Sequence, residues 1–135
     1  MDHAYAFAHY NMARAMGQKQ MNEQALAELQ KIGEVWGTNP TLLAELGYNY
    51  AVLGRKVEAR RVLNELRARS IKEYIDPYPL AFIYIGMGQK DEALRALEQA
   101  YEARSTWIPW LKVEPKFDPI RSDPRFNDLL RRVKI

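Results

Sequence analysis

The chain has 135 residues, of which 47% are hydrophobic and 27% charged, a balance typical of one globular domain rather than of a disordered or fibrous protein. Its 20 Lys and Arg residues and 17 Asp and Glu residues give a net charge of +3, which does not by itself imply a polyanionic partner. The absence of cysteine excludes a disulfide framework, a thiolate nucleophile and a cysteine-based metal site. No apolar run approaches the roughly 18 residues of a membrane span, and the first residues lack the basic stretch of a secretory signal, so we expect a cytoplasmic protein.

A repeat with a period of 34 residues runs through the first 104 residues, as the spacing from Ala25 to Ala59 and on to Ala93 indicates. Other columns agree in size and polarity across the same three copies without a gap. The six columns are Met12/Leu46/Leu80, Ala13/Gly47/Ala81, Met16/Tyr50/Tyr84, Ala25/Ala59/Ala93, Leu29/Leu63/Leu97 and Ile32/Leu66/Ala100. Chance rarely produces so many, so the sequence predicts three copies of one structural unit, at about residues 6–39, 40–73 and 74–104.

Each copy is predicted to form two helices joined by a tight turn. Ala25, Leu29 and Ile32 have the i, i+4, i+7 spacing that places side chains on one helix face, and the later copies repeat this spacing. Helix-breaking residues separate the two helices of each copy, at 17–20, 53–54 and 86–88. The two columns of small residues fall on facing helices, so they predict a close antiparallel contact within each copy.

After Arg104 the period fails, and two prolines interrupt the apolar stretch that follows. Asp118-Pro119 and Asp123-Pro124 each combine a capping side chain with a proline suited to the first helical position. Each pair therefore predicts a helix start, the second for a helix over residues 124–132. Because a solenoid leaves an apolar face at its end, we expect residues 105–135 to be a C-terminal capping segment of the same structural domain.

The repeat resembles the tetratricopeptide repeat. The second copy carries the family motif as Leu46-Gly47 with Tyr50, followed by Ala59 and Leu63. The resemblance implies an all-α fold, a right-handed α-solenoid of three helix–turn–helix units with a concave face. It also implies a non-catalytic role in protein–protein interaction, as a scaffold.

Residues 77–133 further resemble a C-terminal tetratricopeptide module of bacterial signalling and regulatory proteins, and the run from Phe117 to Phe126 is the most specific part of that likeness. In that family the module often follows a kinase, cyclase or winged-helix DNA-binding domain. We find no such domain in this sequence. We expect either a stand-alone adaptor or the C-terminal piece of a larger protein.

No pattern in the sequence predicts a catalytic, cofactor or metal site. His3 and His9 are six residues apart, which fits neither a helical ligand pair nor a zinc motif. The serines lie in predicted connections without a histidine partner, and the glycines at 86–88 lack the Lys-Ser/Thr of a phosphate loop. We therefore expect that the protein is not an enzyme and uses no cofactor or metal.

Basic residues gather in two stretches. Seven of them stand against two acidic residues between Arg55 and Lys72, and seven stand against four from Lys112 onward. Such clusters can bind nucleic acid, but they are more often the solvated face of an amphipathic helix. We regard nucleic acid as an unlikely partner.

The concave face is the strongest candidate for a binding site, as a groove for a peptide or helix of a protein partner. The family lines this face with fixed positions of the first helix of each repeat. Transferred to this sequence, the candidate groove residues are Tyr10, Arg14, Thr41, Tyr48, Val52, Tyr78, Phe82 and Ile85. They form a mostly apolar, aromatic surface suited to apolar anchors.

Three alternatives remain open for the function. Part of the aromatic stripe could instead pack under the tail. The Lys and Asn set with which some relatives hold a peptide carboxylate is missing here, and Glu45 is expected to repel such a group. The chain could also form a homo-oligomer through the N-terminal repeat, where no capping helix precedes Met1, Ala4, Tyr5 and Ala8. Alternatively, it could serve as the sensor or oligomerisation end of a larger signalling or transcription-regulatory protein.

Overall fold

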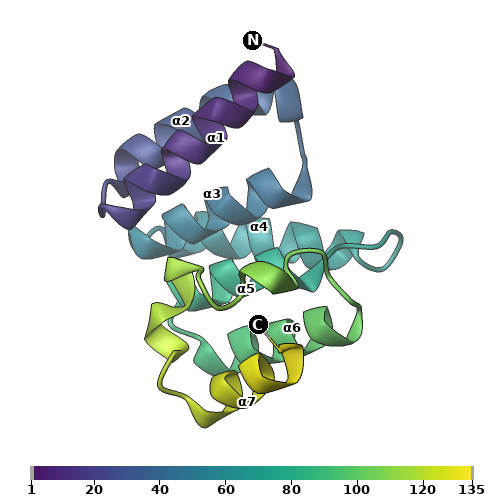
Figure 1. Ribbon diagram of the computed structural model, residues 1–135. Helices are drawn as coiled ribbons and strands as arrows, with labels where there is room; N and C mark the ends of the chain where they lie inside the picture. Colours follow the sequence, from purple (N-terminus) through teal and green to yellow (C-terminus); the bar gives the residue numbers. More distant parts are fainter. Residues whose placement is uncertain (1, 135) are drawn as a thin grey trace.

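A computed structural model describes residues 2–134, and over that range the chain is helical without strands. The elements in chain order are α1 (His3–Gln18), α2 (Asn22–Trp36), α3 (Pro40–Val52), α4 (Lys56–Arg69), α5 (Pro77–Gly86), α6 (Lys90–Glu102), the 3-10 helices η1 (Ile108–Trp110) and η2 (Pro115–Ile120), and α7 (Pro124–Val133). Figure 1 shows α1–α2, α3–α4 and α5–α6 as three hairpins stacked in order. The prediction of an all-helical tetratricopeptide-like solenoid is confirmed.

Capping side chains decide where the first helix of each hairpin begins. The Asp2 carboxylate accepts a hydrogen bond from the Tyr5 amide at 2.7 Å, and Asn39 accepts from the Thr41 amide at 2.9 Å. Asp76 accepts from the Tyr78 amide at 2.9 Å. The cap of α3 and that of α5 each stand before a proline, whose missing N–H costs nothing at the first helical position.

The small columns lie at the helix contacts, as predicted. Ala59 and Ala93 are completely buried, and the small residues of the other column, Gly47 and Ala81, are buried as well. A Cβ placed on Gly47 would stand 2.8 Å from Ile83 Cδ1 and 3.2 Å from Val62 Cγ1. Small residues therefore let the helices approach closely within each hairpin and between neighbouring hairpins.

Gly86 lies where α5 comes close to the backbone of α3, and we expect Gly86→Ala to be destabilising. A Cβ at this position would lie 2.9 Å from Ala51 Cβ and 3.0 Å from the backbone oxygen of Tyr48, neither of which can swing away. Relieving the clash requires α5 to shift from α3, at a cost of about 1–3 kcal/mol. Gly33→Ala is the matched control, since its Cβ would meet only Leu42 at an ordinary 3.9 Å. Urea unfolding of the two variants measures the difference, and equal stabilities would contradict the close approach.

Two helix boundaries differ from the sequence prediction. Helix α5 begins at Pro77 rather than near Tyr74, because Asp76 supplies the cap and residues 70–76 form a long connection. Asp118-Pro119 starts no helix, so that prediction was wrong. The pair lies inside η2, which Glu114-Pro115 has already begun, and the Asp118 carboxylate accepts from Arg121 Nε at 2.6 Å instead. The helix predicted after Asp123 is confirmed as α7.

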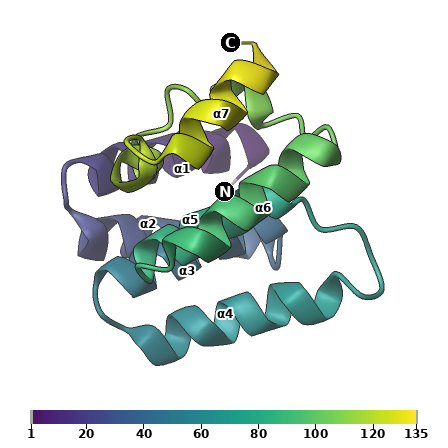
Figure 2. The same cartoon turned by 90° about the horizontal axis from the view of Figure 1, so that it is seen from below.

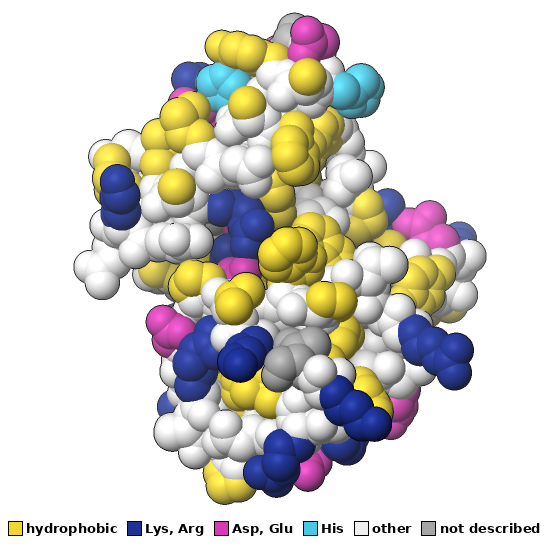
Figure 3. Space-filling view, in the orientation of Figure 1, with side chains coloured by type: hydrophobic (Ala, Val, Ile, Leu, Met, Phe, Trp, Pro, Cys, Tyr) yellow, Lys and Arg dark blue, Asp and Glu magenta, His cyan; other side chains and the backbone are white. Residues whose placement is uncertain are grey.

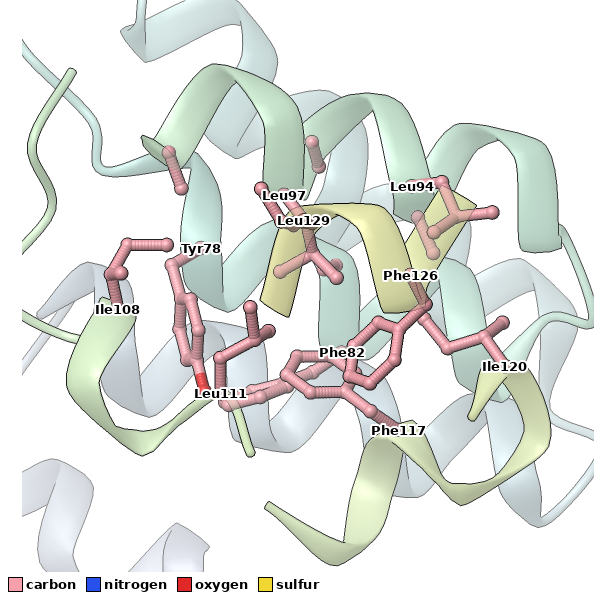
Figure 4. Close-up of a cluster of buried hydrophobic side chains, with 14 residues drawn as sticks. Tyr78, Phe82, Leu94, Leu97, Ile108, Leu111, Phe117, Ile120, Phe126 and Leu129 are labelled. Atoms are coloured by element: carbon pink, nitrogen blue, oxygen red, sulfur yellow. The ribbon is translucent and has the colours of Figure 1, made fainter. Parts of the chain in front are cut away.

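The C-terminal segment after α6 builds the largest core cluster together with α5 and α6. Figure 4 shows Phe117 and Phe126 turned toward Phe82 and the aliphatic side chains of α6 and α7. From the tail, the buried members are Ile108, Leu111, Phe117, Ile120, Phe126 and Leu129. Helix α7 returns alongside α6, as Figure 2 shows. The tail is thus part of the folded core rather than an appendage.

Candidate functional site

The eight candidate groove residues lie on α1, α3 and α5, the first helices of the three hairpins, and their exposure differs widely. Tyr10, Tyr78 and Phe82 are buried. Four others are half-buried, and Val52 alone of the eight is well exposed. The residues that are not fully buried are Arg14, Thr41, Tyr48, Ile85 and Val52. Thr41 sits in the first turn of α3, where Asn39 caps its amide.

The C-terminal segment covers the aromatic residues of α5. The Phe117 ring lies edge-on to Tyr78 at 5.5 Å between ring centroids and tilted against Phe82 at 5.7 Å. The Trp107 ring stacks on Tyr78 at 6.1 Å. Tyr78 and Phe82 are therefore not groove residues open to a partner in this arrangement. They form the floor on which the tail packs, as in the alternative that placed part of the stripe under the tail.

Lys116 enters the concave face from η2 and is the centre of a buried ionic cluster. Its Nζ lies 3.2 Å from Glu45 Oε1 and 3.4 Å from Glu114 Oε1. The same ammonium group lies over the rings of Tyr48 and Phe82, at 5.1 and 4.8 Å from their centroids. Only 8% of Lys116 is exposed, so the side chain is held by α3, α5 and its own segment together.

Arg14 completes this cluster from α1. Its Nη2 donates to Glu114 Oε2 at 2.6 Å, and its Nε lies 3.6 Å from Glu45 Oε1. Two cations and two anions balance, which is the condition under which buried charges are tolerated. The expectation that Glu45 repels a carboxylate thus needs correcting, because Arg14 and Lys116 neutralise it.

Burial near this ionic cluster raises the pKa of three tyrosine hydroxyls. Desolvation, reinforced by the nearby carboxylates of Glu45 and Glu114, raises the pKa of the Tyr48 hydroxyl to about 12. The same main cause raises the pKa of Tyr10 and of Tyr78 well above the ordinary range. All three phenols are therefore held in the neutral form.

We expect the fold to lose stability at alkaline pH for this reason. A raised folded-state pKa contributes stability that is complete below the ordinary pKa of about 10 and is lost as the pH rises through 12. A tyrosinate absorbance titration of wild type and Tyr48→Phe should differ by one group with a midpoint near 12. If the group that the Tyr48→Phe variant lacks titrates near 10 in the wild type, which is the value of a free phenol, the buried position of Tyr48 is contradicted.

Two openings remain in the concave face, one on each side of the tail. The first, a cavity of about 530 Å³, lies between α1 and residues 107–115. Its lining includes Tyr10 and Arg14 as well as Phe7, Trp110 and Val113. The second, of about 470 Å³, is lined by Arg14, Tyr48, Val52, Ile85 and Lys116 among others. Figure 3 shows the hollow on this face, with charged side chains at its bottom and hydrophobic ones beside them.

A comparison with protein-family models identifies the architecture independently of the geometry. The model of the tetratricopeptide repeat matches residues 78–103, which comprise most of α5 and all of α6. Residues 78–103 are therefore a tetratricopeptide repeat. Searches of curated proteins and of solved structures found no match. Tetratricopeptide repeats mediate protein–protein interaction and form a family of non-catalytic repeats.

The two basic stretches differ in their ion pairing. Tail arginines tie the tail to α6, since Arg125 Nη2 lies 2.8 Å from Asp91 Oδ1 and Arg132 pairs with Glu98. On α4, Arg60 and Arg67 have no ion pair within the described residues. The tail arginines therefore have a structural role, whereas in the first stretch Arg55 and Arg69 are paired, with Glu23 and Glu73, and Arg60 and Arg67 are not.

Sequence reasoning missed the residues that the tail contributes to the concave face of the tetratricopeptide repeats. In the sequence they are inconspicuous, since Glu114 and Lys116 lie in the predicted capping segment and Trp110 and Val113 in its interrupted apolar stretch. The signal available was the run itself, because apolar side chains between prolines need a surface to cover. No cluster of three or more potential metal ligands occurs between residues 2 and 134, and over the same span no helix is both long and apolar enough to cross a membrane.

Proposed function

We propose that this tetratricopeptide repeat protein is a non-catalytic binding module that takes up a peptide or short helix of a protein partner in the concave cavity between α1 and the tail. The observation that carries the proposal is the exposure of three apolar side chains around this cavity. Phe7, Trp110 and Val113 are 57%, 58% and 63% exposed. Exposed aromatic side chains that surround a concavity are the usual anchors of protein recognition.

The floor of the cavity supports an orienting role for its polar groups. Arg14 and Glu114 line it together with the ring of Tyr10. The Arg14 side chain is 26% exposed, although its guanidinium is paired and its Nε is buried. An apolar anchor between Phe7 and Trp110 is thereby combined with a charged group that can bind a polar atom of the ligand. The predicted groove residues Tyr48, Val52 and Ile85 extend the proposed surface on the other side of the tail.

The test uses a partner obtained by affinity capture and mass spectrometry and then titrated against purified variants. Phe7→Ala with Trp110→Ala should weaken binding by roughly tenfold or more, since hot-spot aromatics each contribute more than 1 kcal/mol. The matched control is Val57→Ala with Tyr74→Ala, two side chains that are at least as exposed but do not line the cavity. Equal affinity for wild type and the Phe7/Trp110 variant would remove this cavity from consideration.

Self-association through α1 is a second candidate, favoured by a comparison between repeats. In α3, Leu42, Glu45 and Asn49 are buried, whereas the α1 residues 34 positions earlier, Ala8, Asn11 and Ala15, are all exposed. The face of α1 that would stack on a preceding repeat is thus uncovered and uncharged. Of the face predicted from the sequence, Ala4, Tyr5 and Ala8 are exposed, and Met1 lies outside the described residues.

Light scattering over a concentration series tests this second candidate. A dimer that Ala8→Glu with Ala15→Glu dissociates would support an α1–α1 interface, because the two carboxylates would be buried without partners. A monomer at every concentration would exclude it.

We further propose, from the resemblance of residues 117–126, a cytoplasmic setting in a bacterial signalling or regulatory protein.

A further inference from the structure

A second groove lies outside the concave face, between α4 and α6. Two adjoining cavities of about 710 and 550 Å³ share Arg67, Tyr84 and Glu92 and so form one continuous groove. Figure 2 shows α4 set apart from α6, the second helices of the second and third hairpins. From Arg60 to its end at Arg69 the α4 wall measures about 13.5 Å at the helical rise, which is enough for about two and a half turns of a bound helix.

The floor of this α4–α6 groove is apolar. Leu63 from α4, Leu80 and Tyr84 from α5, and Met87 directly after α5 line it. At one end stands Ile71, whose side chain is 85% exposed and belongs to the connection after α4. An isolated isoleucine so fully in solvent at the mouth of an apolar groove is suited to contact a ligand rather than the core.

The walls of the groove carry positive charge that the protein itself does not compensate. Arg60, Arg67, Lys90 and Arg95 line it against Asp91 and Glu92. The two acidic residues are already engaged, Glu92 with Arg95 at 2.7 Å and Asp91 with Arg125 at 2.8 Å. Arg60 and Arg67 on α4 therefore face the groove with their charge unmatched.

The neighbouring interval between α2 and α4 shows how such a groove is closed. There Arg55 Nη2 donates to Glu23 at 2.7 Å, and Arg69 Nη1 donates to the Thr38 carbonyl at 2.7 Å. Between α4 and α6, by contrast, no hydrogen bond or ion pair is found in the part of the chain that the structure describes. Arg55 and Arg69, at the two ends of α4, thus bridge the interval between α2 and α4, whereas the interval between α4 and α6 stays open.

We propose that the α4–α6 groove is a docking site for an acidic amphipathic helix of a partner protein. Leucine-like side chains of such a helix would cover Leu80, Tyr84 and Met87, and its carboxylates would pair with Arg60 and Arg67. A nucleic acid would match the arginines but leave the apolar floor and Ile71 unused, so the protein helix is the occupant that satisfies both features. This site is separate from the concave cavity and does not depend on the function proposed for it.

The experiment uses a designed probe, a fluorescein-labelled helical peptide of about four turns with leucines along one face and glutamates on both flanks. The variant Arg60→Glu with Arg67→Glu should weaken its binding to the full chain by roughly tenfold or more. The matched control, Lys56→Glu with Arg61→Glu, makes the same charge change on exposed α4 residues that do not line the groove, and should change affinity by less than about threefold. Ile71→Ser tests the apolar contribution without touching the core.

The outcomes are distinct. Loss of affinity confined to the groove variants, with amide chemical shifts moving at Tyr84 and Arg67, supports the proposal. Equal weakening in the two charge-reversal variants indicates nonspecific attraction and overturns it. No binding of the acidic peptide, or equal binding of a single-stranded DNA of the same charge, also overturns it.

Discussion

Phe117→Ala is expected to lower the free energy of unfolding by about 3–5 kcal/mol. The Phe117 side chain is completely buried and contacts the rings of Tyr78, Phe82 and Phe126, at centroid distances of 5.5, 5.7 and 6.2 Å. Removing the ring leaves a cavity between α5, η2 and α7 that rigid helices cannot close. It also takes away the contact that holds η2 against the concave face.

Urea unfolding followed by circular dichroism measures this effect, with Phe7→Ala as the control. Phe7 is the same residue type but is exposed, so its truncation should cost less than about 0.5 kcal/mol. A loss below about 1 kcal/mol for Phe117→Ala would mean that the ring is not in the core, and that the tail does not lie on the concave face.

Removing one charge from the buried cluster is the second large prediction. Glu45→Leu leaves Arg14 and Lys116 with Glu114 as their one shared anion, and Glu45 itself is only 1% exposed. Breaking a buried pair by removing one partner costs about 3–5 kcal/mol, because the remaining charge stays desolvated and unmatched. Lys116→Met should cost a similar amount, since it leaves two carboxylates against Arg14.

The double variant Glu45→Leu with Lys116→Met distinguishes charge balance from simple loss of contacts. It restores one cation and one anion, Arg14 and Glu114, which lie 2.6 Å apart. The double variant should therefore lose clearly less stability than the sum of the two single variants. Arg55→Met is the control for an exposed pair, Arg55 with Glu23, and should cost less than about 1 kcal/mol. Strict additivity of the two buried substitutions would contradict the cluster.

The repeat architecture was predictable because its determinants are local. Ala59 and Leu63 are one helical turn apart, and the contact they make is repeated in each copy, so the period of the sequence already contains the packing. The same is true of α7, whose start at Asp123-Pro124 depends on neighbouring residues alone.

The occupied concave face was not predictable in this way. Arg14 and Glu114 are 100 residues apart in the chain, and no periodicity links them. Assigning residues 105–135 to an end cap therefore favours Tyr78 and Phe82 as open groove residues, and their packing under the tail, which the structure shows, is only an alternative at that point. Glu45 was misinterpreted for the same reason, because its two cations come from α1 and η2.

A similar lesson applies to the basic residues. Composition placed Arg60 and Arg125 in comparable clusters, yet only the second has its charge matched, by Asp91 and Asp123. Which arginine finds a carboxylate depends on how the hairpins stack, and that information appears only in three dimensions.

The position of the tail in the concave face is tested most directly by nuclear Overhauser contacts in the full chain. The structure predicts contacts from the Phe117 ring to the rings of Tyr78 and Phe82, and from the Lys116 methylenes to Tyr48. Finding them would place η2 inside the curve of the repeats. A Phe82 ring with contacts to α3 and α6 but none to residues 114–120 would show an open groove and contradict the account.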